Sequence, residues 1–132
     1  MVIKTLIDRG ANKKAKDVLG WGALHTAAWS GHEDTIKTLV QSLNAKKQGR
    51  DERGWTPLHV AAMNGRDPAV RCLIEQLGVD KEAKDNLGWT ALHFVAAFGL
   101  EDTAELLIKT LGVDRDARNK NGETAQALAE RW

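Results

Sequence analysis

The chain repeats itself every 34 residues, and this periodicity limits its fold more than any other feature. Gly-Trp pairs at positions 20, 54 and 88 open three parallel segments, GWGALHTAAWSG, GWTPLHVAAMNG and GWTALHFVAAFG. A fourth start, GETAQALAERW, follows after the same interval at Gly122. Such a period is typical of solenoids, whose short units stack because one unit alone cannot bury its apolar face.

The repeat predicts a single domain over residues 1–132, built from a half unit, three full units and another half unit. We place the full units at 20–53, 54–87 and 88–121, with partial units at 1–19 and 122–132. In the last of these, Gln126 and Ala127 replace the Leu-His pair of the full units, which predicts a capping half repeat. Residues 1–19 match only the second half of a unit. We therefore expect an exposed apolar side on its helix, with room for the natural chain to extend upstream.

Each full unit predicts two short helices separated by a glycine. Thr56 and Thr90 are N-cap candidates for the first helix, whereas Gly22 takes their place in the first full unit and predicts a weaker helix there. The second helix follows acidic residues and carries apolar residues at helical spacing. Gly78 and Gly112 then favour a left-handed C-cap, and the Asp-x-x-Gly turn that follows predicts an extended finger loop.

These motifs identify a family resemblance that covers essentially the whole chain. Thr-Pro-Leu-His-x-Ala-Ala at 56–62, Gly65 and Asp-x-x-Gly at 85–88 resemble the ankyrin repeat. Tetratricopeptide repeats share the period and a Trp-x-x-Leu opening, but their pattern needs a Tyr, which this chain lacks. The resemblance implies an all-α ankyrin-repeat solenoid of stacked helix-turn-helix units with extended β-hairpin-like finger loops. Each 34-residue unit has one residue more than the family's usual period of about 33, and we place this extra residue at the end of the second helix.

His25, His59 and His93 also recur with the repeat, which suggests either metal ligands or a structural role. Packed helices lie about 10 Å apart, whereas zinc needs nitrogens about 2 Å from one centre. The resemblance implies instead that each imidazole bonds to the Thr hydroxyl of its own unit and to the backbone of a neighbouring finger. We therefore expect no metal and no cofactor.

Composition excludes several function classes. The net charge of +1 argues against non-specific nucleic-acid binding. No apolar stretch is long enough to span a bilayer, and no secretory signal opens the chain.

The single cysteine, Cys72, suits a reducing compartment and predicts a cytoplasmic or nuclear protein. We expect its side chain to be half-buried in the second helix. No nucleophile–base pair, paired carboxylates or phosphate loop is present, so we expect no enzyme activity.

The charge is unevenly distributed along the chain. Residues 1–53 hold ten Lys and Arg against six Asp and Glu, a balance of +4. Residues 54–132 hold nine against twelve, a balance of −3. The two ends of the molecule should therefore carry opposite potentials.

The resemblance implies that a protein or peptide partner docks on the concave side, formed by the finger tips and the first helices. The partner-binding candidates there are Leu19, Trp21, Trp29, Arg53, Trp55, Met63, Leu87, Trp89, Phe98 and Glu123. Identity at one repeat position gives Trp21, Trp55 and Trp89 two interpretations, a binding role or stacking between fingers. Trp29 and Phe98 break the repeat and are the better candidates for partner-specific contacts.

A basic surface is a second candidate for recognition of acidic groups, although polar loops are usually solvated. Its residues are Lys13, Lys14, Lys16, Lys46, Lys47, Arg50 and Arg53. The function that we expect is a non-catalytic protein–protein interaction module, monomeric or weakly self-associating through the N-terminal helix. The alternatives are a structural or self-associating array and a targeting arm of a larger protein.

Overall fold

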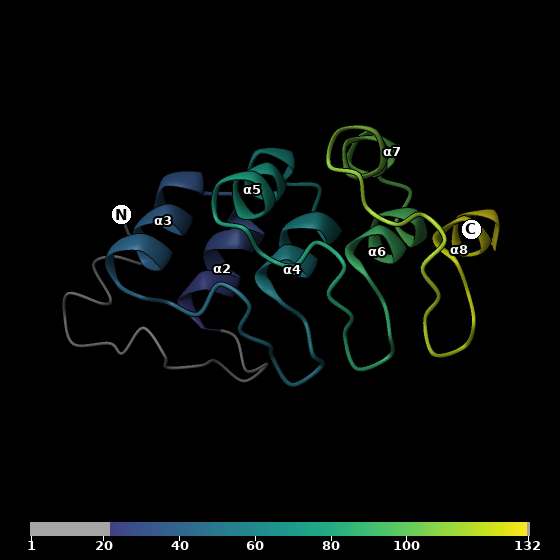
Figure 1. Ribbon diagram of the computed structural model, residues 1–132, viewed down its shortest axis with the longest axis horizontal. Coiled ribbons are helices and arrows are strands. Elements are labelled where there is room, and N and C mark those ends of the chain that lie inside the picture. The colour runs from purple at the N-terminus through teal and green to yellow at the C-terminus, as the bar shows by residue number, and fades with distance from the viewer. Residues whose placement is uncertain (1–21, 132) are drawn as a thin grey trace.

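The computed structural model describes residues 22–131, and within them it contains helices and loops but no strand. The first helices of successive units, which we call inner helices, form one row, and the second helices form an outer row (Figure 1). The inner helices are α2 (Ala23–Ser30), α4 (Pro57–Met63), α6 (Ala91–Ala97) and α8 (Ala125–Arg131). The outer helices are α3 (Glu33–Lys37) with η1 (Thr38–Ser42), α5 (Asp67–Arg71) with η2 (Cys72–Gln76), and α7 (Glu101–Glu105) with η3 (Leu106–Thr110). This arrangement confirms the all-α solenoid.

The inner helices begin as their caps predict. The hydroxyl of Thr56 accepts a hydrogen bond from the backbone N–H of His59 at 3.3 Å, and Thr90 does the same for His93 at 3.4 Å. Gly22 gives α2 no side-chain cap bond, as expected from the missing hydroxyl. Finger loops then connect the outer helix of one unit to the inner helix of the next and lie along one side of the array (Figure 1).

Each outer helix changes from α to π geometry in its second half. The backbone N–H of Leu43 bonds to the carbonyl of Thr38 at 3.2 Å, five residues earlier, and Leu77 and Leu111 repeat this bond at 3.0 Å. A π-helical turn takes up one extra residue within an α-helix. It therefore accounts for the 34-residue period at the place where the sequence predicted the insertion.

The core lies between the two rows of helices and runs the length of the array. Ile36, Val70 and Leu107 are fully buried in successive outer helices, against inner-helix residues such as Ala61 and Val95. Units that share one continuous core stabilise one another, whereas an isolated helix pair would expose it.

Cys72 belongs to this core, and the prediction that it is half-buried was wrong because its exposed fraction is 0%. Burial raises the pKa of the Cys72 thiol and outweighs the opposing effect of Lys37. The thiol is therefore a packing group that stays protonated at neutral pH.

Candidate functional site: the finger face

The finger tips are held by an acidic or amide side chain at the start of each turn. One carboxylate oxygen of Asp51 accepts the backbone N–H groups of Arg53 and Trp55 at 2.8 and 2.9 Å. Asp85 holds the next finger in the same way, and Asn119 does so in the third. These side chains are buried, so the loops that present the candidate binding residues are rigidly set.

Histidines connect each inner helix to the following finger. Nε2 of His25 lies 2.7 Å from the carbonyl oxygen of Trp55, and Nε2 of His59 lies 2.9 Å from that of Trp89. His93 completes the series at 2.8 Å from the carbonyl of Glu123. The contact to the neighbouring finger that the family resemblance implied is thereby confirmed at all three positions.

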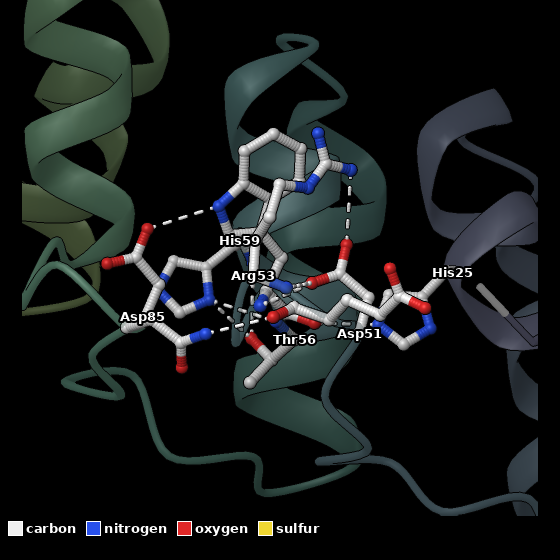
Figure 2. A network of polar contacts seen from close by, with 9 residues as sticks. His25, Asp51, Arg53, Thr56, His59 and Asp85 are labelled. Carbon is white, nitrogen blue, oxygen red and sulfur yellow. Dashed lines mark hydrogen bonds and ion pairs between the residues drawn. The ribbon is translucent and has the colours of Figure 1, made fainter. Parts of the chain in front are cut away.

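The other ring nitrogen of His59 fixes the tautomer. Nδ1 accepts the backbone N–H of Thr56 at 3.0 Å and lies 2.9 Å from the Thr56 hydroxyl, so the proton of the neutral ring belongs on Nε2. Burial lowers the pKa of His59, although the carbonyl of Trp89 and the carboxylate of Asp85 act in the opposite direction. Figure 2 shows His59 between Thr56 and Asp85 in this network.

Trp55 and Trp89 occupy the same repeat position but differ in their polar contacts. The indole N–H of Trp55 donates to a carboxylate oxygen of Asp85 in the next finger at 3.1 Å. The residue that corresponds to Asp85 one unit later is Asn119, whose oxygen is occupied by two backbone N–H groups and whose amide donates to Glu123. Asn119 therefore does not offer the N–H of Trp89 the carboxylate acceptor that Asp85 offers Trp55. Trp55 therefore has a structural role, which is one of the two interpretations of this repeat position.

Both indoles also contact the ring of Phe94, a residue of the inner helix α6. The Trp55 and Phe94 rings meet edge-to-face with centroids 5.6 Å apart, and the Trp89 ring lies 5.0 Å from Phe94. The guanidinium of Arg53 stacks on the outer side of Trp55, 3.3 Å from the ring centroid, and pairs with Asp51 at 3.2 Å. Arg53 is thus part of the aromatic wall as well as a surface charge.

Between these fingers lies an open cavity of ≈ 400 Å³, which we call the finger pocket. Its lining combines predicted binding residues with the aromatic base: Glu52, Arg53, Trp55, Asp85, Asn86, Leu87, Trp89 and Phe94. Leu87 stands at its rim with 65% of its surface exposed, the largest value among the described large apolar side chains. The structure therefore brings four predicted residues, Arg53, Trp55, Leu87 and Trp89, to one place.

The remaining predicted residues lie elsewhere. Trp29 is 40% exposed and Phe98 57% exposed, each near the end of an inner helix. Met63 is buried at 8% exposure, so its side chain offers little surface to a partner. Glu123 is only partly exposed and contributes its carbonyl to His93. Leu19 and Trp21 lie outside the described residues.

Lys47 and Arg50, two members of the basic surface, have a structural role that sequence reasoning missed. The ammonium of Lys47 donates to the carbonyl of Leu77, at the end of the next outer helix, at 2.7 Å. Lys81 makes the equivalent bond to Leu111 at 2.8 Å. Arg50 reaches the carbonyl of Lys84 in the next finger base. The available signal was periodic, because Lys47 and Lys81 are 34 residues apart, as are Arg50 and Lys84.

Two features of residues 22–131 bear on other functions. No three His, Cys, Asp or Glu side chains in this part of the chain are grouped as a metal site requires. None of its helices combines the length and the apolar character that a bilayer crossing demands.

Comparison with known proteins gives matches along most of the sequence. A family model described as ankyrin repeats in three copies matches residues 1–85, and a model of the single ankyrin repeat matches residues 87–120. No curated protein matches the chain.

Proposed function

The chain belongs to the ankyrin repeat family, whose members are generally non-catalytic protein–protein interaction modules, and from this premise we propose that it binds a partner protein or peptide on the finger face. The observation that carries the proposal is the finger pocket, an aromatic-lined cavity formed by two rigid fingers. Pockets of this kind take the large side chains that dominate interface energy.

The chemistry of the pocket indicates what it accepts. Its walls are the rings of Trp55, Trp89 and Phe94, which favour an apolar or aromatic side chain. Asn119 does not offer the N–H of Trp89 the carboxylate acceptor that Asp85 offers Trp55, and in the proposed complex this N–H donates to a carbonyl or carboxylate beside the bound side chain. Leu87 would close over the bound group from the rim. The partner segment proposed is therefore an extended peptide with one large apolar anchor.

Trp29 and Phe98 extend this surface beyond the pocket. Both are exposed large apolar side chains at the ends of α2 and α6, inner helices of one row with α4 between them (Figure 1). A partner that also contacts either residue would cover more than one unit. We further propose a cytoplasmic or nuclear location, supported by a lone cysteine that is buried as a thiol.

Capture of binding proteins from cell extract on the immobilised chain would test the proposal. Leu87→Asp places a charge at the pocket rim, and Gln76→Asp is the matched control on exposed surface of an outer helix. A partner that uses the pocket should lose about 30-fold in affinity with Leu87→Asp, the equivalent of about 2 kcal/mol, and none with Gln76→Asp. Trp29→Ala then measures how far the interface extends. Equal capture by wild type and Leu87→Asp, with circular dichroism unchanged, would refute the proposed site.

A further inference from the structure

A second apolar recess lies at the C-terminal end of the array, away from the finger pocket. It has a volume of ≈ 570 Å³ between the last outer helix and the helices α6 and α8. We call it the terminal groove. Its apolar lining includes Ala96, Leu100, Ala104, Ile108 and Ala129, with Glu101 and Arg115 as charged members.

In the preceding units the same surface is covered by the next outer helix. A Cβ atom built on Gly31 would lie 2.9 Å from the side chain of Arg66, and one built on Gly65 would lie 3.8 Å from Leu100. A Cβ on Gly99, the equivalent position beside the groove, would meet nothing within 4 Å. The terminal groove is therefore shaped as the seat of an outer helix that residues 22–131 do not supply.

Polar contacts support the same interpretation. Where α7 covers the second unit, the hydroxyl of Thr103 donates to the carboxylate of Asp67. Glu101 is the residue equivalent to Asp67 one unit later, and it is an exposed acid at the rim of the groove. A segment that binds in the groove is therefore favoured if it has an apolar helix face with hydrogen-bond donors or positive charge beside that face.

The sequence of this chain contains such a segment outside the described residues. Ile3-Lys4-Thr5-Leu6-Ile7 matches Ile36-Lys37-Thr38-Leu39-Val40 except at its last residue, and the latter is the core stretch of the first described outer helix. The ankyrin family match also includes residues 1–19. This segment lies in the basic half of the chain, of balance +4, whereas the groove lies in the acidic half, of balance −3. Opposite potentials favour the approach of one end to the other.

We propose that the terminal groove binds residues 2–10 of a second copy of this chain, which joins copies head to tail. The second copy supplies the outer-helix half that completes the unit begun by α8. The contact is heterologous, since it joins two different surfaces, and it generates open chains of copies rather than a closed dimer. This proposal is independent of the finger pocket and does not rest on the proposed function.

The junction is weaker than those within one chain, for a reason seen in the sequence. Within the chain, His59 and His93 each connect an inner helix to the next finger. The equivalent position in α8 is Ala127, which has no group to reach a following finger. Association between copies therefore depends on the groove alone and increases with protein concentration.

Sedimentation equilibrium of the 132-residue chain, from about 10 μM to about 1 mM, tests the first part of the proposal. The expected result is a mass that rises with concentration beyond that of a dimer. Ala129→Arg, on the exposed side of α8 that lines the groove, should weaken association at least about 10-fold. Thr110→Arg, at an exposed position that does not line the groove, should leave it unchanged. A strict monomer throughout this range would overturn the proposal.

A mixing experiment then separates head-to-tail joining from a symmetric contact. Leu6→Arg alters the segment and Ala129→Arg alters the groove, so each variant alone should be monomeric at a concentration at which the wild type has just begun to associate. An equimolar mixture should form a one-to-one dimer that does not grow, because the intact groove of one variant accepts the intact segment of the other. If Leu6→Arg alone still associates, or if the mixture stays monomeric while the wild type associates, the proposed pairing is wrong. Circular dichroism of each variant establishes that it is folded.

Discussion

At the scale of single residues, one exchange between acid and amide separates two fingers that are otherwise alike. Asp85 offers a second oxygen to the indole of Trp55, whereas Asn119 presents an N–H₂ group at the corresponding place and cannot accept from Trp89. Trp55 is thus bound to the scaffold by a contact that Asn119 cannot give Trp89. The same residue type at the same repeat position therefore has a different role in each finger.

This difference predicts unequal effects of the same substitution. Trp55→Phe removes a hydrogen bond to a buried carboxylate and should lower the free energy of unfolding by about 1–2 kcal/mol more than Trp89→Phe. Each variant serves as the control for the other, because both lose a similar area of aromatic surface. Urea denaturation followed by circular dichroism measures the difference. Equal losses would mean that the Trp55–Asp85 bond contributes nothing net.

His59 predicts a loss of stability in acid. Its pKa in the folded state lies below the unfolded value of 6.5, mainly because the ring is buried. The unfolded state therefore binds more protons, and the stabilisation present above pH 6.5 decreases as the pH falls through 6.5 toward the folded pKa. Protonation of Nδ1 would also abolish its acceptor role toward Thr56. His59→Gln should reduce the slope of unfolding free energy against pH over this window, and an unchanged slope would contradict the assignment.

At the scale of secondary-structure elements, the inner helices differ in how well their first turns are closed. In α4 and α6 the Thr and His side chains each accept a hydrogen bond from the other residue's backbone N–H, forming a capping box. In α2 the N-cap is Gly22, with extended backbone angles that any residue can adopt and no side-chain cap. Local stability therefore rises from the first described unit toward the second and third.

Replacement of the N-cap residue should raise the stability of the protein in α2 and lower it in α6. Gly22→Thr should stabilise the protein by about 0.5–1 kcal/mol through the added cap and the lost freedom of the unfolded chain. Thr90→Gly should destabilise it by about 1–3 kcal/mol, because it also removes a partner of buried His93. Hydrogen exchange of the amides in α2 and α6 locates each effect. A loss of stability with Gly22→Thr would show that the first finger cannot accommodate the side chain.

At the scale of the whole molecule, the array is coupled by cations as well as by its core. Lys47 and Lys81 each place an ammonium at the negative end of the following outer helix, where the unpaired carbonyls of a helix terminus attract positive charge. Finger backbones add one direct bond per pair, from Asn86 to Arg53 and from Lys120 to Leu87. Each unit therefore influences only its immediate neighbour, which is the condition for one-dimensional coupling.

Weakening the coupling between units should change the width of the denaturation curve as well as its midpoint. Lys47→Met keeps most of the apolar stem and removes the charge, so the free energy of unfolding should fall by about 0.5–1 kcal/mol. Because the lost bond joins two units, the denaturation curve should also broaden. Lys109→Met, which removes a pair with Glu105 within one outer helix, is the control that leaves the width unchanged. Identical widths for both variants would argue against coupling through Lys47.

The period of the sequence predicted the stacked helix pairs, their caps, the position of the extra residue and the histidine contacts, because all of these recur in register. The site was predicted less completely. The finger positions predict that Arg53, Trp55, Leu87 and Trp89 lie together. The different contacts of the two indoles depend on a single acid-to-amide difference between Asp85 and Asn119. The burial of Met63 and the contact from Lys47 depend on neighbouring units, which one repeat read alone does not reveal.

The π-helical turn has a consequence for how such a chain changes length. Because all three described outer helices carry the same extra residue at the same place, it belongs to the unit and not to any particular neighbour. An additional repeat unit inserted between η2 and α6 would contact units of the same shape on both sides. Gene duplication could therefore lengthen the array by whole units and extend its reach toward larger targets without altering how each unit packs on the next.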